Sequence, residues 1–179
     1  MNFKKNRLNW YISAVLIFSL LILVPQSATA AENSKVFLEI DGITGTSIFE
    51  GEERNIEVSS FAFGVARHVS LEAGNIANRE ATLPSFSGIS FTKPLDIATV
   101  PIMKKHLTRI PFEAEFHFYF GEQKVPFYTI KLKDALISSY SQGNETESIT
   151  ISYSAIEFIY SDGKNTYRFG YDLRKATPL

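Results

Sequence analysis

The chain of 179 residues contains no cysteine, and this absence excludes several classes of protein at once. Without thiols there are no disulfides, no thiolate zinc site, no cysteine nucleophile and no lipid-modified cysteine anchor. A strong charge is also lacking. The formal net charge is −1, which argues against a nucleic-acid binder driven by bulk charge. Because 45% of the residues are hydrophobic, the chain is not a disordered protein, and its length suits one folded domain.

The first thirty residues carry the three parts of a secretory signal in the expected order. These parts are the basic residues Lys4, Lys5 and Arg7, the uncharged run from Trp10 to Val24, and the small-x-small pattern Ala28-Thr29-Ala30. We expect cleavage between Ala30 and Ala31. The uncharged run is short for a membrane span, which needs about 20 apolar residues. A retained anchor is therefore the weaker alternative, and no stable span is expected after cleavage.

Removal of residues 1–30 would leave a mature domain of residues 31–179 with a different charge. The removed segment holds three basic residues and no acidic ones, so the remaining 149 residues have 15 basic and 19 acidic side chains and a net charge of −4. The domain would function as a secreted or periplasmic protein.

Alternation with a period of two dominates residues 31–179 and predicts β-strands. The alternating runs are Val36 to Ile40, Ile56 to about Val69 (through Val58, Ser60 and Ala62), Ile89 to Phe91, Ala114 to Phe120, Tyr128 to Leu132, Ile149 to Tyr160 and Tyr167 to Tyr171. A shift of phase near Ser154 predicts a β-bulge. Asp162-Gly163 predicts a hairpin turn.

One helix is expected, from Thr99 to about Thr108. Thr99 is a candidate N-cap, and Val100, Met103 and Leu107 share one face, which we expect to cover a sheet. The pattern predicts a single antiparallel β-domain, a sandwich or a small barrel, with one short helix.

A search for catalytic, cofactor-binding or metal-binding residues finds little. His68, His106 and His117 are far apart and lack metal-ligand spacing, so each is expected to be an ordinary surface or half-buried histidine. Glu113 and Glu115 are two residues apart on a strand and resemble a glycosidase pair, but they fit a solvated strand face better. We therefore expect no catalytic residue, no cofactor and no metal.

Five segments, in this order, resemble the haemolysin-coregulated protein (Hcp) family, the tube subunit of type VI secretion. They are V-F-L-E-I-D-G-I-T-G (Val36 to Gly45), I-E-V-S-S-F-A-F-G (Ile56 to Gly64), I-S-F-T-K-P-L-D-I-A-T-V-P-I-M (Ile89 to Met103), Y-T-I-K-L-K-D-A-L-I-S-S-Y-S (Tyr128 to Ser141) and F-G-Y-D-L (Phe169 to Leu173). The resemblance covers nearly all of the mature chain.

The resemblance implies an antiparallel β-barrel of two packed sheets with one flanking helix. It implies six subunits in a ring, with rings stacked into a hollow tube that can carry effectors and that works with spike and sheath proteins. It further implies a Gram-negative bacterium and no enzyme activity or cofactor. The loop from Ser70 to Ser85 corresponds to the segment that contacts neighbouring rings. Its candidate stacking residues are Ser70, Glu72, Asn75, Asn78, Arg79 and Glu80.

Two other functions stay open at this stage. An exported monomeric β-domain could reuse the same fold to bind a ligand or partner on an exposed sheet. An enzyme such as a glycosidase, using Glu113 and Glu115, is the weakest alternative.

Overall fold

The computed structural model describes residues 34–69, 82–121 and 123–179. The chain divides into two units, Met1–Ala31 and Glu32–Leu179, and the description concerns the second. The expected export segment, with Ala28, Ala30 and Ala31, lies outside the described residues. So do the six candidate stacking residues of the loop, which are Ser70, Glu72, Asn75, Asn78, Arg79 and Glu80. Among the described residues, no helix is both long enough and apolar enough to cross a membrane.

The domain is built almost entirely from antiparallel strands, as the alternation predicts. The strands are β1 (Ser34–Ile40), β2 (Ile56–Val58), β3 (Ser60–Ala62), β4 (Val65–Ala66), β5 (Ser85–Phe86), β6 (Ile89–Pro94), β7 (Phe112–Phe120), β8 (Tyr128–Gln142), β9 (Thr146–Ser152), β10 (Ala155–Ser161), β11 (Thr166–Asp172) and β12 (Thr177–Pro178). The helix α2 (Thr99–Thr108) lies between β6 and β7.

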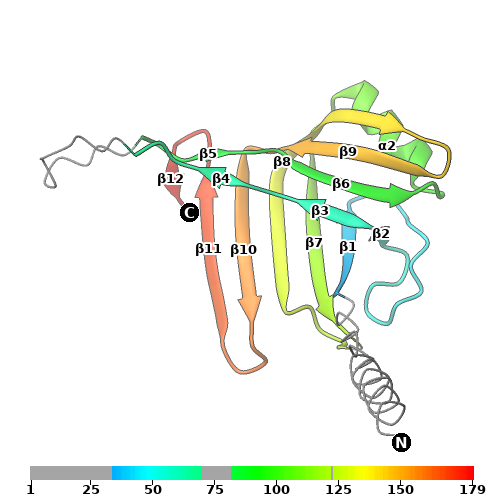
Figure 1. The fold of residues 1–179 in the computed structure, drawn as a ribbon, viewed down its shortest axis with the longest axis horizontal. Helices are drawn as coiled ribbons and strands as arrows, with labels where there is room; N and C mark the ends of the chain where they lie inside the picture. Colours follow the sequence, from blue (N-terminus) through cyan, green and yellow to red (C-terminus); the bar gives the residue numbers. More distant parts are fainter. Residues whose placement is uncertain (1–33, 70–81, 122) are drawn as a thin grey trace, which may run out of the picture. The chain divides into compact units, whose positions relative to one another are not determined.

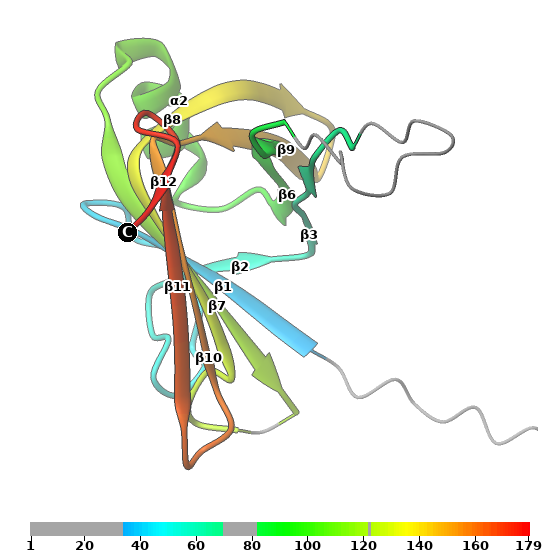
Figure 2. The ribbon, with the colours of Figure 1, turned by 90° about the vertical axis from the view of Figure 1, so that its left-hand side faces the viewer.

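Two sheets surround one core, and one strand, β8, takes part in both of them. The larger sheet has the order β12-β11-β10-β8-β7-β1-β2, and the second joins β3, β6, β9 and the far half of β8. At one corner β8 continues from the first sheet into the second, and at the other Ser59 connects β2 to β3. Figure 2 shows the larger sheet nearly edge on, with β3, β6 and β9 to one side of its upper half. The fold is the expected barrel-like pair of antiparallel sheets with one flanking helix.

The core lies between the inner faces of the two sheets. Leu38, Phe116 and Ile130 stand side by side across β1, β7 and β8 and are at most 1% exposed. Ile89 and Ile151 of the second sheet are fully buried opposite them. Burial of this aliphatic and aromatic ladder is the main force that holds the sheets together, at roughly 25 cal/mol per Å² of apolar surface.

Two expectations about the strands are wrong in detail. The strand from Ile56 does not keep one phase, because the chain changes sheets at Ser59. Ser60 and Ala62 are therefore exposed, and Phe61 turns inward instead. Near Ser154 there is no bulge within one strand. The chain turns a corner there, from β9 in the second sheet to β10 in the first.

The helix α2 has the predicted bounds but not the predicted orientation. Ile102 is its buried residue, whereas Val100 and Leu107 are 75% and 71% exposed. Thr99 is also not the N-cap: it is the first helical residue, and its N–H donates to the carbonyl of Asp96. The orientation was predicted wrongly because helical periodicity identifies faces but not which face a particular sheet covers.

Candidate functional site

The hairpin of β10 and β11 carries an exposed strip of aromatic side chains. Phe158 pairs with Phe169, and Tyr160 pairs with Tyr167, so all four side chains point to the same face. That face is the core face, since Phe158 packs against the hydrophobic core. Tyr160, Tyr167 and Phe169 are nevertheless 46%, 60% and 54% exposed. The core ladder thus extends beyond the cover of the second sheet, and we call these three residues the aromatic strip.

The strand β11 also leaves part of its backbone edge unpaired among the described residues. On its outer side β12 pairs only with Tyr171 and Asp172, so residues 166–169 have no strand partner there. Unpaired N–H and C=O groups along a strand are a ready template for pairing with another chain. Two residues of the aromatic strip, Tyr167 and Phe169, lie on β11, the strand that has this free edge, and Tyr160 lies on its neighbour β10 (Figure 1).

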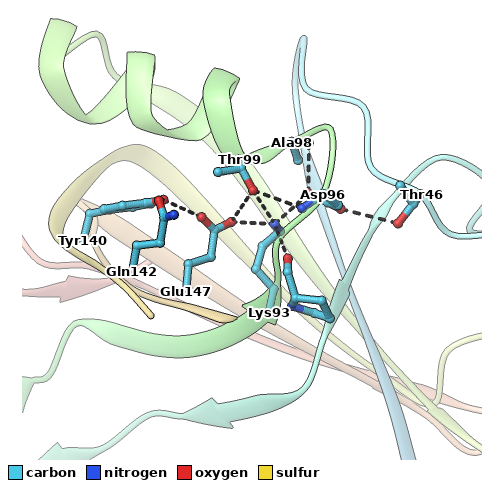
Figure 3. A network of polar contacts seen from close by, with 9 residues as sticks. Thr46, Lys93, Asp96, Ala98, Thr99, Tyr140, Gln142 and Glu147 are labelled. Atoms are coloured by element: carbon cyan, nitrogen blue, oxygen red, sulfur yellow. Dashed lines mark hydrogen bonds and ion pairs between the residues drawn. The ribbon is translucent and has the colours of Figure 1, made fainter. Parts of the chain in front are cut away.

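The most densely bonded polar group in the domain lies at the base of α2 (Figure 3). The side chains of Lys93 and Glu147 are both fully buried, and Lys93 Nζ lies 2.5 Å from Glu147 Oε1. Lys93 Nζ also donates to Asp96 Oδ1 at 2.6 Å and to the carbonyl of Pro94 at 2.8 Å. All donors of the ammonium group are used, so this site is structural: it has no free group to offer a substrate.

The same network fixes the start of the helix. Asp96 Oδ1 accepts a hydrogen bond from the N–H of Ala98 at 2.9 Å, and Thr99 Oγ1 accepts one from the N–H of Asp96 at 3.1 Å. Tyr140 donates to Glu147 Oε2 at 2.6 Å. Burial and the hydrogen bond to Glu147 raise the pKa of Tyr140 to about 12. The network therefore joins β6, α2, β8 and β9.

A second polar cluster holds the loop between β1 and β2 against β7. The carboxylate of Glu52, 2% exposed, accepts hydrogen bonds from His117 Nδ1 at 2.7 Å and from the hydroxyl of Tyr119 at 2.5 Å. Asn55 Nδ2 donates to its other oxygen at 2.6 Å. Beside it, the Phe49 ring packs against Tyr119, with ring centroids 5.0 Å apart. The loop is thus fixed by a small core of its own on the outer face of the sheet.

The residues that the sequence suggested for catalysis are occupied or isolated. Glu115 is paired with Lys131 at 2.7 Å and lies 3.4 Å from His117 Nε2, while Glu113 is exposed. His117 is half-buried, as expected, but its partner Glu52 was missed. A contact that spans 65 residues leaves no local spacing signal. Within the described ranges, no group of three or more His, Asp or Glu side chains could hold a metal ion.

A hollow beside the sheet has a volume of about 760 Å³. It lies where β1 and β2 meet the tips of two loops. The residues that line it are Ser34, Lys35, Val36, Phe37, Ile48, Phe49, Glu50, Glu57, Val58, Gln123 and Lys124. Two of these residues form an ion pair, with Lys124 Nζ 2.8 Å from Glu50 Oε1.

Comparison with solved structures identifies the fold. Hcp1 from Salmonella typhimurium superposes with a TM-score of 0.69 over 82% of this chain and 99% of its own, at 20% identity. Hcp2 from the same organism gives 0.61 over 78% and 96%, at 24% identity. A structure described as a type six secretion system protein gives 0.74 over 82% and 100%, at 20% identity. A search of curated proteins finds no match.

The sequence itself matches the family described as "Type VI secretion system effector, Hcp" over residues 37–160. The match spans more than half of the chain and runs from β1 to the end of β10, including the buried core and both polar clusters. The chain belongs to the Hcp family of type VI secretion proteins.

Proposed function

We propose that the chain is a ring-forming tube subunit of type VI secretion that is exported through its N-terminal signal. Membership of the Hcp family supports the tube role. The main observation in support of a ring is the aromatic strip. Tyr160, Tyr167 and Phe169 lie on the same face as the core side chains, yet they are exposed to solvent in the single chain. An exposed aromatic patch beside a free strand edge is the expected form of a subunit contact.

A closed ring needs two different complementary surfaces on each subunit. The larger sheet offers its two opposite ends. At one end is β11 with the aromatic strip; at the other, Ser34 and Lys35 of β1 pair with β7 alone among the described strands. We propose that the β11 edge of one subunit meets the β1–β2 side of the next, and that six such contacts close a hexamer.

Stacking of rings is proposed for the loop from Ser70 to Ser85, including Ser70, Glu72, Asn75, Asn78, Arg79 and Glu80. Support comes from its described ends. Val65 pairs with Phe86 and Ala66 with Ser85, and His68 and Thr82 are hydrogen-bonded to each other, so the loop begins and ends at one two-stranded ribbon. Spike, sheath or effector proteins are the proposed further partners.

The test is the mass of the exported protein in solution, by native mass spectrometry and sedimentation. We expect a hexamer, which Tyr167→Asp with Phe169→Asp converts to monomers because two charges would enter an apolar contact. Thr166→Asp, on the same strand but the other face, should leave it intact. A wild-type protein that stays monomeric at high concentration would refute the ring. Intact mass reports export: retention of residues 1–30 would contradict cleavage after Ala30.

The second candidate function is an exported monomeric binding module. The hollow of about 760 Å³ beside β1 and β2 favours it, because ligand pockets commonly measure 300–1,000 Å³. The same mass measurement separates the two candidates. A monomer that binds a ligand in this hollow, and loses it on Phe49→Ala, would support the module.

A further inference from the structure

The helix α2 turns apolar side chains toward solvent. Val100 and Leu107 are 75% and 71% exposed, while Ile97 just before the helix and Ile110 just after it are 61% and 60% exposed. We call these four residues the α2 patch. Four large apolar side chains exposed within one short segment point to an interaction site, since single exposed apolar residues are common but groups of them are not.

The α2 patch is also basic. Residues 97–110 contain Lys104, Lys105 and Arg109 and no acidic residue, while the rest of the expected mature chain has 12 basic and 19 acidic residues. Helical spacing places exposed Lys104 beside Val100 and Leu107. The patch therefore complements a partner that is both anionic and partly apolar.

The acidic residues next to the patch in the sequence do not cancel this charge. Asp96 precedes it, but its carboxylate is bound to Lys93 Nζ at 2.6 Å and to the N–H of Ala98 at 2.9 Å. Glu113 follows it and is exposed, so residues 97–113 still carry a net charge of +2. Positive charge is thus concentrated in one segment of a chain that is otherwise acidic.

The patch is held in place before any partner binds. Ile102, 1% exposed, anchors the inner side of α2, and His106 Nδ1 lies 2.9 Å from the carbonyl oxygen of Ile137 on β8. The Lys105 ammonium lies 5.0 Å from the centre of the Phe112 ring. A preformed surface loses little conformational entropy on binding.

We propose that the α2 patch docks on the surface of an anionic lipid bilayer. A helix that lies in the bilayer interface buries an apolar side to a shallow depth, and its lysine and arginine side chains reach the headgroups. Four apolar and three basic residues within the short segment 97–110 suffice for this contact, whereas a stable protein interface takes about 20–30 residues a side. The proposal does not depend on the ring, although several copies in one ring would bind with greater avidity.

The test is sedimentation of the exported protein with vesicles of phosphatidylcholine, with and without phosphatidylglycerol, after intact mass has established its N-terminus. We expect binding that requires phosphatidylglycerol and weakens with salt. Val100→Asp with Leu107→Asp should weaken it by about tenfold or more. Lys104→Glu with Arg109→Glu should also abolish the preference for anionic vesicles.

The matched control is Val125→Asp. Val125 is 68% exposed but lies in a segment, residues 121–127, with one acidic residue and one basic residue and thus no net charge. Its substitution should leave vesicle binding unchanged. Absence of binding, equal binding to pure phosphatidylcholine, or an equal effect of Val125→Asp would overturn the proposal. If Val100→Asp with Leu107→Asp instead breaks the oligomer in the absence of vesicles, the patch is a contact between copies and the bilayer proposal is wrong.

Discussion

His117 Nδ1 lies 2.7 Å from Glu52 Oε1, and this pair fastens the β1–β2 loop to β7 across 65 residues of sequence. Burial alone would lower the pKa of His117, but the hydrogen bond and the charge of Glu52, with a smaller effect of Glu115, raise it above its usual value of 6.5. Burial alone would raise the pKa of Glu52, yet hydrogen bonds from His117, Tyr119 and Asn55 lower it below 4.5. Each group therefore favours the charged form of the other.

These directions fix how the pair contributes to stability across pH. The His117 contribution is complete below pH 6.5 and is lost as pH rises through the raised pKa of the folded state. The Glu52 contribution is complete above pH 4.5 and is lost as pH falls through its lowered pKa. The pair is consequently most stabilising between about pH 4.5 and 6.5.

We predict that His117→Gln lowers the free energy of unfolding by about 1.5–3 kcal/mol at pH 5.5. The loss should be smaller at pH 8.5, where the charged form of His117 no longer contributes. Urea denaturation at both pH values measures it. His106→Gln is the control, because the ring of His106 contacts a backbone carbonyl and has no carboxylate partner among the described residues. An equal loss at both pH values would show that His117 acts through packing alone.

A second prediction concerns the buried ion pair. Lys93→Met should lower the free energy of unfolding by about 3–5 kcal/mol, because it leaves the fully buried Glu147 without its counterion. Lys93→Met combined with Glu147→Gln should recover part of this loss. Urea denaturation at neutral pH measures both variants.

The matched control for Lys93 is Lys124→Met. Lys124 forms an equally direct ion pair with Glu50 at 2.8 Å, but both side chains are 70% exposed. Exposed pairs contribute at most about 1 kcal/mol, so this variant should be nearly neutral. If the two variants proved equally destabilising, burial would not be the cause of the difference.

A third prediction separates the two sides of α2. Ile102→Ala should lower the free energy of unfolding by about 2–5 kcal/mol, because the side chain is 1% exposed and its removal leaves a cavity. Val100→Ala, 75% exposed, should change it by less than about 0.5 kcal/mol. Thermal and urea unfolding of the two variants decide whether the helix is oriented as described.

The sequence predicted the strands well because the inner face of the larger sheet alternates strictly. Leu38 and Phe116 mark the core in an unambiguous period of two. The prediction failed at Ser59 and at Ser154, where the chain passes from one sheet to the other. There the strand partner changes and the alternation of side chains shifts by one residue, but no turn residue in the sequence marks the change. The sheet changes depend on tertiary pairing, which local alternation does not encode.

The polar clusters could not be predicted from the sequence, because they too depend on tertiary contacts between distant residues. Lys93 and Glu147 are 54 residues apart, so no local spacing in the sequence links them. The orientation of the helix was predicted wrongly. Val100, Met103 and Leu107 form its most regular apolar stripe in the sequence, but the residue buried in the structure is Ile102. Here the deviation from the expected pattern is informative, since an apolar stripe left outside is available for a partner.

A last prediction tests whether the β1–β2 loop acts as one unit with the Glu52–His117 pair. Gly45 lies against the strand that follows the loop, and its N–H donates to the carbonyl of Arg54 at 2.6 Å. A Cβ at Gly45 would overlap the carbonyl group of Asn55. Gly45→Ala must therefore push the two ends of the loop apart, and we expect it to lower the free energy of unfolding by about 1–3 kcal/mol.

The displacement should also reach His117, because Asn55 lies next to this clash and its side chain donates to Glu52 at 2.6 Å. In Gly45→Ala the pKa of His117, measured by NMR titration, should move back toward 6.5. Gly64→Ala is the control, since the nearest atom to its Cβ would be Ser87 Oγ at 3.8 Å, an ordinary contact. A His117 pKa unchanged in a destabilised Gly45→Ala variant would mean that the pair holds its geometry independently of the rest of the loop.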